Sequence, residues 1–167
     1  GFGSSIVFSN VNGAAGNTQI GRDGTGTLNI TNGASVSGAT QNLAVVGRKV
    51  GGTGTVNVTG PGSTWTTSSL FVGTDVNFGT VTASGPGGTG TLNVANGGAV
   101  FANDIVNGAT GSIIGGGGTI YANIQNSGTI GPGNSPGLLS VVGDVDLLAG
   151  STLAIEVGGL VFDTGYD

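Results

Sequence analysis

The sequence contains no cysteine, no histidine and no methionine, and few of its residues are charged. Without cysteine the chain forms no disulfide bonds, so its stability depends on packing and on backbone hydrogen bonds. The same absence fits export through a cell envelope. Without histidine and cysteine, the usual nucleophile–base triads, thiolate nucleophiles and zinc sites are excluded. No apolar run approaches the roughly 20 residues that a membrane-spanning helix needs.

Charge is also scarce, at 7% of the 167 residues, with a formal net charge of −5. The cations are Arg22, Arg48 and Lys49. Nucleic-acid binding depends on several Lys or Arg side chains that displace counterions from phosphates, so we predict no nucleic-acid partner. The glycine run at residues 115–118 is followed by no Lys and no helix, unlike a phosphate-binding loop, and no cofactor is predicted.

Glycine is what the chain has in abundance, with 38 residues spaced between short Val, Ile and Leu segments. Apolar residues make up 37% of the chain, which argues against disorder, so we interpret the glycines as turn residues. The segment Gly-Thr-Gly-Thr-(Leu/Val)-Asn-(Ile/Val) occurs three times, at residues 24–30, 52–58 and 88–94. The copies begin 28 and 36 residues apart, a spacing typical of stacked solenoid units.

Within each copy the pattern alternates with period two, as in a half-buried strand. Leu28 and Ile30 share one face, whereas Asn29 lies on the other. No helical period of 3.6 residues accompanies these segments. Two further short strands per unit are predicted, a second at 35–37, 64–66 and 99–101 and a third at 43–46, 70–72 and 105–106.

Two all-β architectures fit three short strands per unit: a parallel β-helix and an antiparallel sandwich or barrel of hairpins. The β-helix would place Leu28, Val56 and Leu92 about 4.8 Å apart in one inward column. Their neighbours Asn29, Asn57 and Asn93 would form an outward ladder. A sandwich makes no such demand of equivalent residues, so the repetition favours the β-helix.

We therefore predict one β-solenoid over residues 1–167, a rod roughly 30 Å long if six or seven coils stack about 4.8 Å apart. The predicted organisation is repeats at about 20–46, 47–86 and 87–114, followed by divergent coils at 115–167.

An insertion and two aromatic residues distinguish the second repeat. The insertion at 74–87 is expected to form either an extra strand pair or a loop that stands off one corner. Trp65 takes the place of Val36 and Val100, which predicts that its ring fills a wide part of the core. The alternative is that Trp65 and Phe71 are exposed and bind carbohydrate or a protein partner.

The repeat pattern of residues 20–114 does not continue in the C-terminal part of the chain. Strands are predicted at 119–124, 128–130, 139–148 and 151–157, with Val141, Val145 and Leu147 as possible core residues.

Glycoside hydrolysis needs paired carboxylates, but Asp144, Asp146 and Glu156 alternate with apolar residues and are predicted to face solvent. Repeated calcium turns need an Asp in every turn, and the three repeated turns have only Asp23. We therefore predict no enzymatic activity and no metal site.

These segments resemble the autotransporter-associated β-strand repeats of bacterial secreted proteins. The resemblance rests on the Gly-Thr-Gly-Thr segments, on residues 60–65 and 70–73, and on the C-terminal stretches 131–138, 143–144 and 150–159. In that family the last pattern runs into Tyr-Asp and a further hydrophobic strand, and here Tyr166 and Asp167 are the last residues. We therefore expect a fragment of a longer polypeptide. The resemblance implies a right-handed parallel β-helix outside the cytoplasm.

The expected function is a structural or adhesive rigid segment of an exported bacterial surface protein. It would lie at the cell surface or outside the cell, in a parent protein anchored to the membrane elsewhere. Its possible partners are a host or surface carbohydrate or protein. The alternative is a self-assembling subunit of an extracellular filament or layer, because the open ends of a β-helix present unpaired strand edges.

Overall fold

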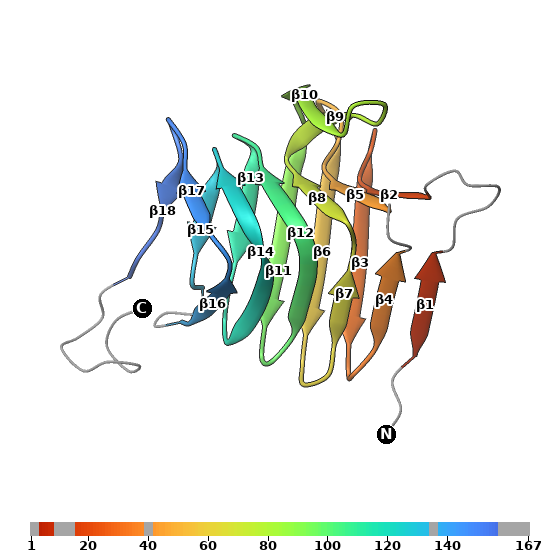
Figure 1. Ribbon diagram of the computed structural model, residues 1–167, viewed down its shortest axis with the longest axis vertical. Helices are drawn as coiled ribbons and strands as arrows, with labels where there is room; N and C mark the ends of the chain where they lie inside the picture. The colour runs from red at the N-terminus through yellow and green to blue at the C-terminus, as the bar shows by residue number, and fades with distance from the viewer. Residues whose placement is uncertain (1–3, 9–15, 39–41, 134–136, 157–167) are drawn as a thin grey trace.

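The computed structural model describes residues 4–8, 16–38, 42–133 and 137–156. Within these residues the chain forms strands and turns, and no helix is present. Most strands run parallel to their neighbours in two curled sheets (Figure 1). The predicted all-β class is confirmed, and the parallel pairing is consistent with a β-solenoid.

The first sheet takes one strand from each successive pass of the chain, in the order β18–β15–β13–β11–β6–β3. The three Gly-Thr-Gly-Thr segments form its adjacent strands β3, β6 and β11. The bounds are β3 (Thr25–Thr31), β6 (Thr53–Thr59), β11 (Thr89–Ala95), β13 (Gly111–Ile114), β15 (Thr129–Gly131) and β18 (Thr152–Leu153).

The second sheet contains the second and third strands of each pass. Its ten strands are β1 (Ser5–Phe8), β2 (Asn17–Ile20), β4 (Ser35–Gly38), β5 (Leu43–Val46), β7 (Thr64–Thr66), β8 (Ser69–Val72), β12 (Ala99–Asn107), β14 (Gly118–Asn126), β16 (Leu139–Val142) and β17 (Val145–Leu147). We call one pass of the chain through both sheets a coil.

The prediction of three short strands per coil holds for β3–β5 and for β6–β8 but is wrong for the next two coils. There the second and third strands join into the long strands β12 and β14. These two strands pair across the corner with a register shift between Phe101 and Asp104, so the ladder continues through a bulge and does not break. On its other side β12 pairs separately with β7 and β8.

Equivalent residues of successive repeats lie side by side, as the spacing predicts. Leu28 pairs in register with Val56, and Val56 with Leu92. The same inward column continues through Ile113, Ile130 and Leu153. Parallel pairing without a slip keeps each apolar side chain on the core face, because a shift of one residue would turn it outward.

The predicted asparagine ladder is present on the outer face of the first sheet. The Asn57 side-chain amide donates to Asn29 Oδ1 over 2.7 Å, and the Asn93 amide donates to Asn57 Oδ1 over 2.6 Å. The Asn57 amide thus donates to one neighbouring coil and accepts from the other. The outward polar row therefore adds hydrogen bonds along the axis to those of the backbone.

The core lies between the two sheets and consists mainly of stacked apolar columns, one of which also contains the buried Asn107 and Asn126. Trp65 pairs with Val36 on one side and Val100 on the other, and only 1% of its surface is exposed. The prediction that Trp65 fills the core is confirmed. A third column contains Ala44, Leu70, Ile105 and Ile124, all nearly or fully buried.

The strands formed by residues 139–148 and 151–157 are shorter than predicted. In place of a single strand over 139–148, β16 and β17 are separated at Gly143, whose φ of 150° marks a bend. Within the predicted strand 151–157, β18 covers only Thr152–Leu153, and Val157 lies outside the described residues. Val145 and Leu147 continue inward columns but are 41% and 51% exposed, because no further described strand covers them.

Candidate functional site

The insertion in the second repeat forms an antiparallel hairpin of β9 (Thr74–Asn77) and β10 (Thr82–Pro86). The expected strand pair, and not the loop, is therefore correct. The Thr74 hydroxyl donates to the carbonyl of Gly85 over 2.9 Å and ties the two strands together at their base. At the tip, the Gly79 N–H donates to Asn77 Oδ1 over 2.9 Å.

The hairpin covers part of the outer face of the second sheet, the face that points away from the main core. Val76 on β9 is 2% exposed and belongs to a small apolar cluster with Leu43, Val45 and Phe71. Phe78 and Val106 are half-buried against this cluster. The insertion therefore covers outward-pointing apolar side chains that the second sheet alone would leave in water.

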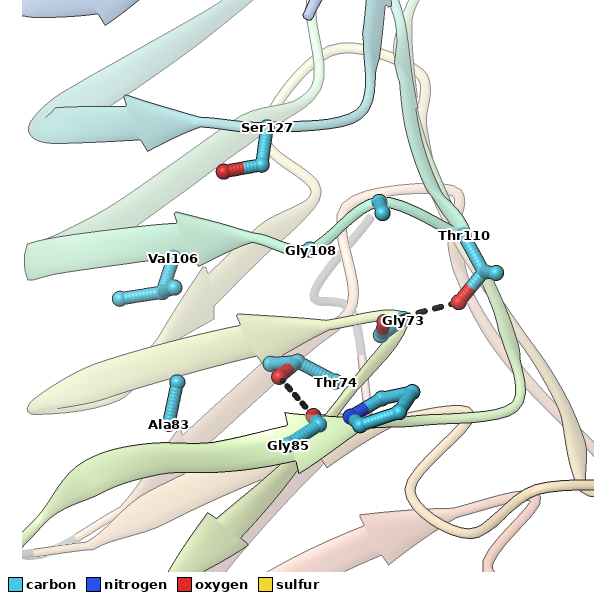
Figure 2. A pocket seen from close by; sticks show the side chains of 10 residues that line it. Gly73, Thr74, Ala83, Gly85, Val106, Gly108, Thr110 and Ser127 are labelled. Atoms are coloured by element: carbon cyan, nitrogen blue, oxygen red, sulfur yellow. Dashed lines mark hydrogen bonds between the residues drawn. The ribbon is translucent and has the colours of Figure 1, made fainter. Parts of the chain in front are cut away.

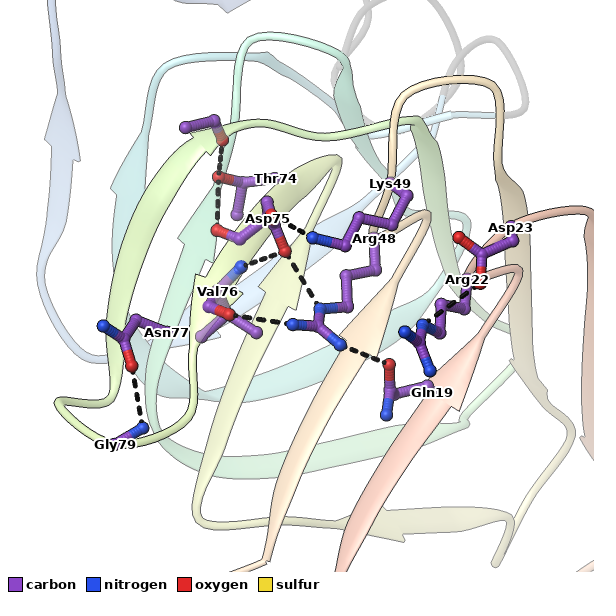
Figure 3. Close-up of polar contacts among 11 residues, drawn as sticks. Gln19, Arg22, Asp23, Arg48, Lys49, Thr74, Asp75, Val76, Asn77 and Gly79 are labelled. Carbon is purple, nitrogen blue, oxygen red and sulfur yellow. Dashed lines mark hydrogen bonds and ion pairs between the residues drawn. The ribbon is translucent and has the colours of Figure 1, made fainter.

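A charged cluster at the base of the hairpin fixes it to the preceding corner (Figure 3). Asp75 accepts from Arg48 Nε over 2.9 Å and from Lys49 Nζ over 2.6 Å. The Arg48 guanidinium also lies 4.4 Å from the ring centre of Phe78 and donates to Gln19 over 2.9 Å. The hydrogen bond from Lys49 is the main reason that the pKa of Asp75 is lowered.

Two grooves run beside β10, between the hairpin and the outer face of β12 and β14. The first, of about 410 Å³, lies among Thr74, Ala83, Val106 and Ser127 (Figure 2). The second, of about 350 Å³, is lined by Phe71, Val81, Ala83 and Val106 with the polar Ser69, Thr82, Asp104 and Gln125. Because both grooves touch Ala83 and Val106, they form neighbouring hollows on one face.

An aromatic pair occupies the same face, farther from the hairpin. The rings of Phe101 on β12 and Tyr121 on β14 stack with centroids 4.6 Å apart and planes 4° from parallel. Both remain in contact with solvent, with 37% and 41% of their surface exposed. Within the described residues Phe101 and Tyr121 form the stacked aromatic pair, which the sequence did not predict.

The two aromatic residues proposed from the sequence as partner-binding residues are both buried in the structure. Trp65 is 1% exposed and Phe71 is 2% exposed. Trp65 points into the main core, whereas Phe71 points outward but lies under the hairpin. The expectation that both rings are exposed is therefore wrong: Phe71 does occupy an outward strand position, but the insertion covers it.

The acidic residues are dispersed as predicted. Asp144, Asp146 and Glu156 are exposed. No group of three or more Asp, Glu, His or Cys residues within the described ranges is arranged to hold a metal ion. No described helix is both long and apolar enough to span a bilayer.

The C-terminal end of the described strand stack is apolar. Ile130, Leu139, Val141, Val145, Leu147, Leu153, Ile155 and Pro132 line an open hollow of about 300 Å³ there. Leu147, Leu153 and Ile155 are each about half exposed, at 51%, 51% and 49%. Leu147 and Leu153 continue inward columns of the two sheets, so this end presents core-like surface to water.

Comparisons of the chain with protein-family models, with curated protein sequences and with solved structures gave no match.

Proposed function

We propose that the chain is a right-handed parallel β-helix that serves as a rigid structural or adhesive segment of an exported bacterial surface protein. The observation that carries this proposal is the unbroken register of the first sheet, where one column runs from Leu28 to Leu153 through six strands. Each coil is held by its neighbours on both sides, so bending the rod would break many backbone hydrogen bonds at once.

The composition and the site chemistry agree with a passive role. Outward positions of the first sheet carry Thr and Asn, which suit an exposed strand and hydrogen-bond along the ladder. The whole chain lacks the histidine and cysteine that most nucleophilic and metal-dependent catalysis requires. No catalytic step is proposed.

The proposed location outside the cell is tested in the bacterium that encodes the chain, and the proposed rigid shape is tested on the purified chain. Antibodies raised against the purified chain would label the outside of unpermeabilised cells in immunogold electron microscopy. Small-angle scattering and proteinase K digestion of the purified chain would show an elongated particle that resists cleavage. Label confined to permeabilised cells would overturn export, and rapid digestion throughout β3–β14 would overturn the rigid rod.

The apolar C-terminal end favours a second candidate, end-to-end association. Among the described strands, β16, β17 and β18 each pair on one side only, and so do β1, β2 and β3 at the other end. The strands at the two ends also occupy equivalent positions within their coils. β16 and β1 are second strands, β17 and β2 are third strands, and β18 and β3 are first strands of their coils.

A second copy placed with β1, β2 and β3 on β16, β17 and β18 would continue every column. Val141 would meet Ile6 of the copy, Leu147 would meet Ile20, and Leu153 would meet Leu28. Such a head-to-tail contact does not close on itself and therefore builds a filament.

Sedimentation velocity over a hundredfold range of concentration tests this arrangement. We expect concentration-dependent growth that Leu147→Lys abolishes and that the exposed turn substitution Val50→Lys leaves unchanged. A monomer at all concentrations, or equal effects of the two variants, would refute self-assembly.

A further inference from the structure

The outer face of β12 and β14 carries features that a passive rod does not require. One outward column of the second sheet runs through Ser37, Thr66, Phe101, Tyr121 and Val142. The small hydroxyl residues of β4 and β7 are followed by two large rings on the next two strands. The stacked pair therefore rises from a polar surface.

The orientation of the rings leaves aromatic surface accessible. Their centroid separation of 4.6 Å is close to the usual spacing of about 4.8 Å between neighbouring strands, so the rings stack along the axis of the solenoid. Each ring covers one face of the other. The second face of Phe101 lies on the side of Thr66, whose short side chain leaves room beside it.

Hydrogen-bonding groups lie between the rings and the hairpin. Asp104 pairs in register with Ser69 and Asn123, which places all three on the outer face next to the ring column. Gln125 follows in the next outward column, beside Val106. The side chains of Asp104, Asn123 and Gln125 are exposed. Within the described residues, no hydrogen bond or ion pair engages the side chains of Asp104 and Gln125.

The second groove extends this surface and makes it concave. Its apolar floor contains Phe71 and Val106, and Asp104 and Gln125 contribute polar groups to its wall. Phe101 and Val106 are five residues apart on β12, and the bend between Phe101 and Asp104 makes their separation shorter than the about 16 Å of a straight strand. The surface thus combines an aromatic pair, a row of polar side chains and a hollow over a length that suits a chain of several sugar units.

Charge limits the chemistry of the ligand. Arg48 and Lys49 are bound to Asp75 on the other side of the hairpin, and Arg22 pairs with Asp23. No described cation is therefore free to pair with a phosphate, sulfate or carboxylate on this face, whereas Asp104 would repel such groups. A ligand with apolar C–H faces and uncharged hydroxyl groups can stack on the rings and form hydrogen bonds with the row of polar side chains.

We propose that the outer face of β7, β8, β12 and β14, from the Phe101–Tyr121 pair to the β10 groove, binds a neutral oligosaccharide. One sugar ring stacks its C–H face on Phe101 or Tyr121, since an aromatic face is amphipathic and attracts C–H groups. The next sugars lie toward the hairpin, where Asp104 accepts hydrogen bonds from hydroxyl groups and Gln125 both donates and accepts. This site gives the proposed surface segment its adhesive partner and rests on that proposal.

The purified chain is first tested on an array of neutral plant, fungal, bacterial and animal glycans that also carries sialylated and sulfated members. Isothermal titration then measures the affinity for the soluble oligosaccharide that binds best. Phe101→Ala combined with Tyr121→Ala is expected to weaken binding about tenfold or more, because the stacking surface is lost. Asp104→Asn is expected to weaken binding about threefold. The matched control Ile114→Ala, at an exposed outward position of the first sheet, should leave the affinity unchanged.

Each outcome decides the proposal. Binding to no neutral glycan, a preference for anionic members, or equal effects of the ring and control variants would overturn it. The circular dichroism spectrum and unfolding midpoint of every variant show whether the solenoid is intact. Lost binding with an intact fold supports the site, and Asp104→Asn provides that test even if the ring variant unfolds. Failure to bind glycans by a protease-resistant rod would refute this site and leave the scaffold function standing.

Discussion

Three leucines of one column provide the sharpest test of the stacked core. Leu92 is fully buried between Val56 and Ile113, Leu28 is half-buried near one end, and Leu153 is 51% exposed at the other. The same substitution, Leu→Ala, can therefore be made at three depths of a single column. Differences in cost then report burial alone, since residue type and strand position are held constant.

The expected magnitudes follow from burial. Leu92→Ala removes three buried carbon groups at about 0.8 kcal/mol each, or about 2.4 kcal/mol, and leaves a cavity that the flanking coils cannot fill. We expect a total loss of about 3–5 kcal/mol. Leu153→Ala removes half-exposed carbon and leaves no closed cavity, so about 1 kcal/mol is expected. Leu28→Ala should fall between these two values.

Urea unfolding followed by far-ultraviolet circular dichroism gives the free energy of unfolding of each variant. The fluorescence of Trp65, in the neighbouring column, provides a second probe, and coincidence of the two transitions checks two-state behaviour. Equal losses for Leu92→Ala and Leu153→Ala would refute the reasoning, because a column with a real interior cannot be equally tolerant at its centre and its end.

Four other substitutions, one of them a control, test the remaining contacts. Asn57→Ala removes two hydrogen bonds of the ladder and should cost about 1 kcal/mol in urea unfolding, and no loss would show that the ladder is not stabilising. Gly54→Ala would put a β-carbon closer than 3.0 Å to backbone atoms and should cost about 2–3 kcal/mol, whereas Gly24→Ala, with nothing within 4 Å, should be neutral. Because its pKa is lowered in the folded state, ionised Asp75 stabilises the fold fully above about pH 5, and this contribution is lost as pH falls below about 4. Unfolding midpoints between pH 7 and pH 3 should therefore decline less for Asp75→Asn than for the original chain, and parallel curves would contradict the pairing with Lys49.

Much of the fold could be predicted because the near-identical repeats show which residues occupy equivalent positions in successive coils. Once Leu28, Val56 and Leu92 are recognised as equivalent, parallel pairing in register follows, and so do the inward position of Trp65 and the outward asparagines. The C-terminal strands were less predictable. Residues 139–148 alternate like one strand, but Gly143 adopts a backbone conformation open chiefly to glycine, and the strand breaks there.

The candidate site could not be predicted, because it depends on contacts between segments that are not repeats of one another. Phe71 lies on the outward side of β8, but only the folded hairpin shows that Val76 covers it. Phe101 and Tyr121 belong to different coils and become neighbours only through the register of β12 and β14. The available signal was the alignment of residues 99–101 with 119–121, which would have brought the two rings together.

The glycine between the two threonines of each repeat is not a turn residue, although the glycine-rich composition suggests that role. Gly26, Gly54 and Gly90 pair in register and have ordinary, negative φ angles, so turn formation does not require them. A β-carbon at any of the three would collide with the backbone of the preceding corner, at Gly21, Gly47 or Gly73 respectively, and these three corner glycines do have positive φ. The corner glycine is thus needed for its positive φ, and the glycine between the threonines is needed because a β-carbon would not fit. The absence of that β-carbon lets the first strand of each coil pack directly against the preceding corner. Threonine on either side keeps β-propensity high where glycine alone would weaken the strand.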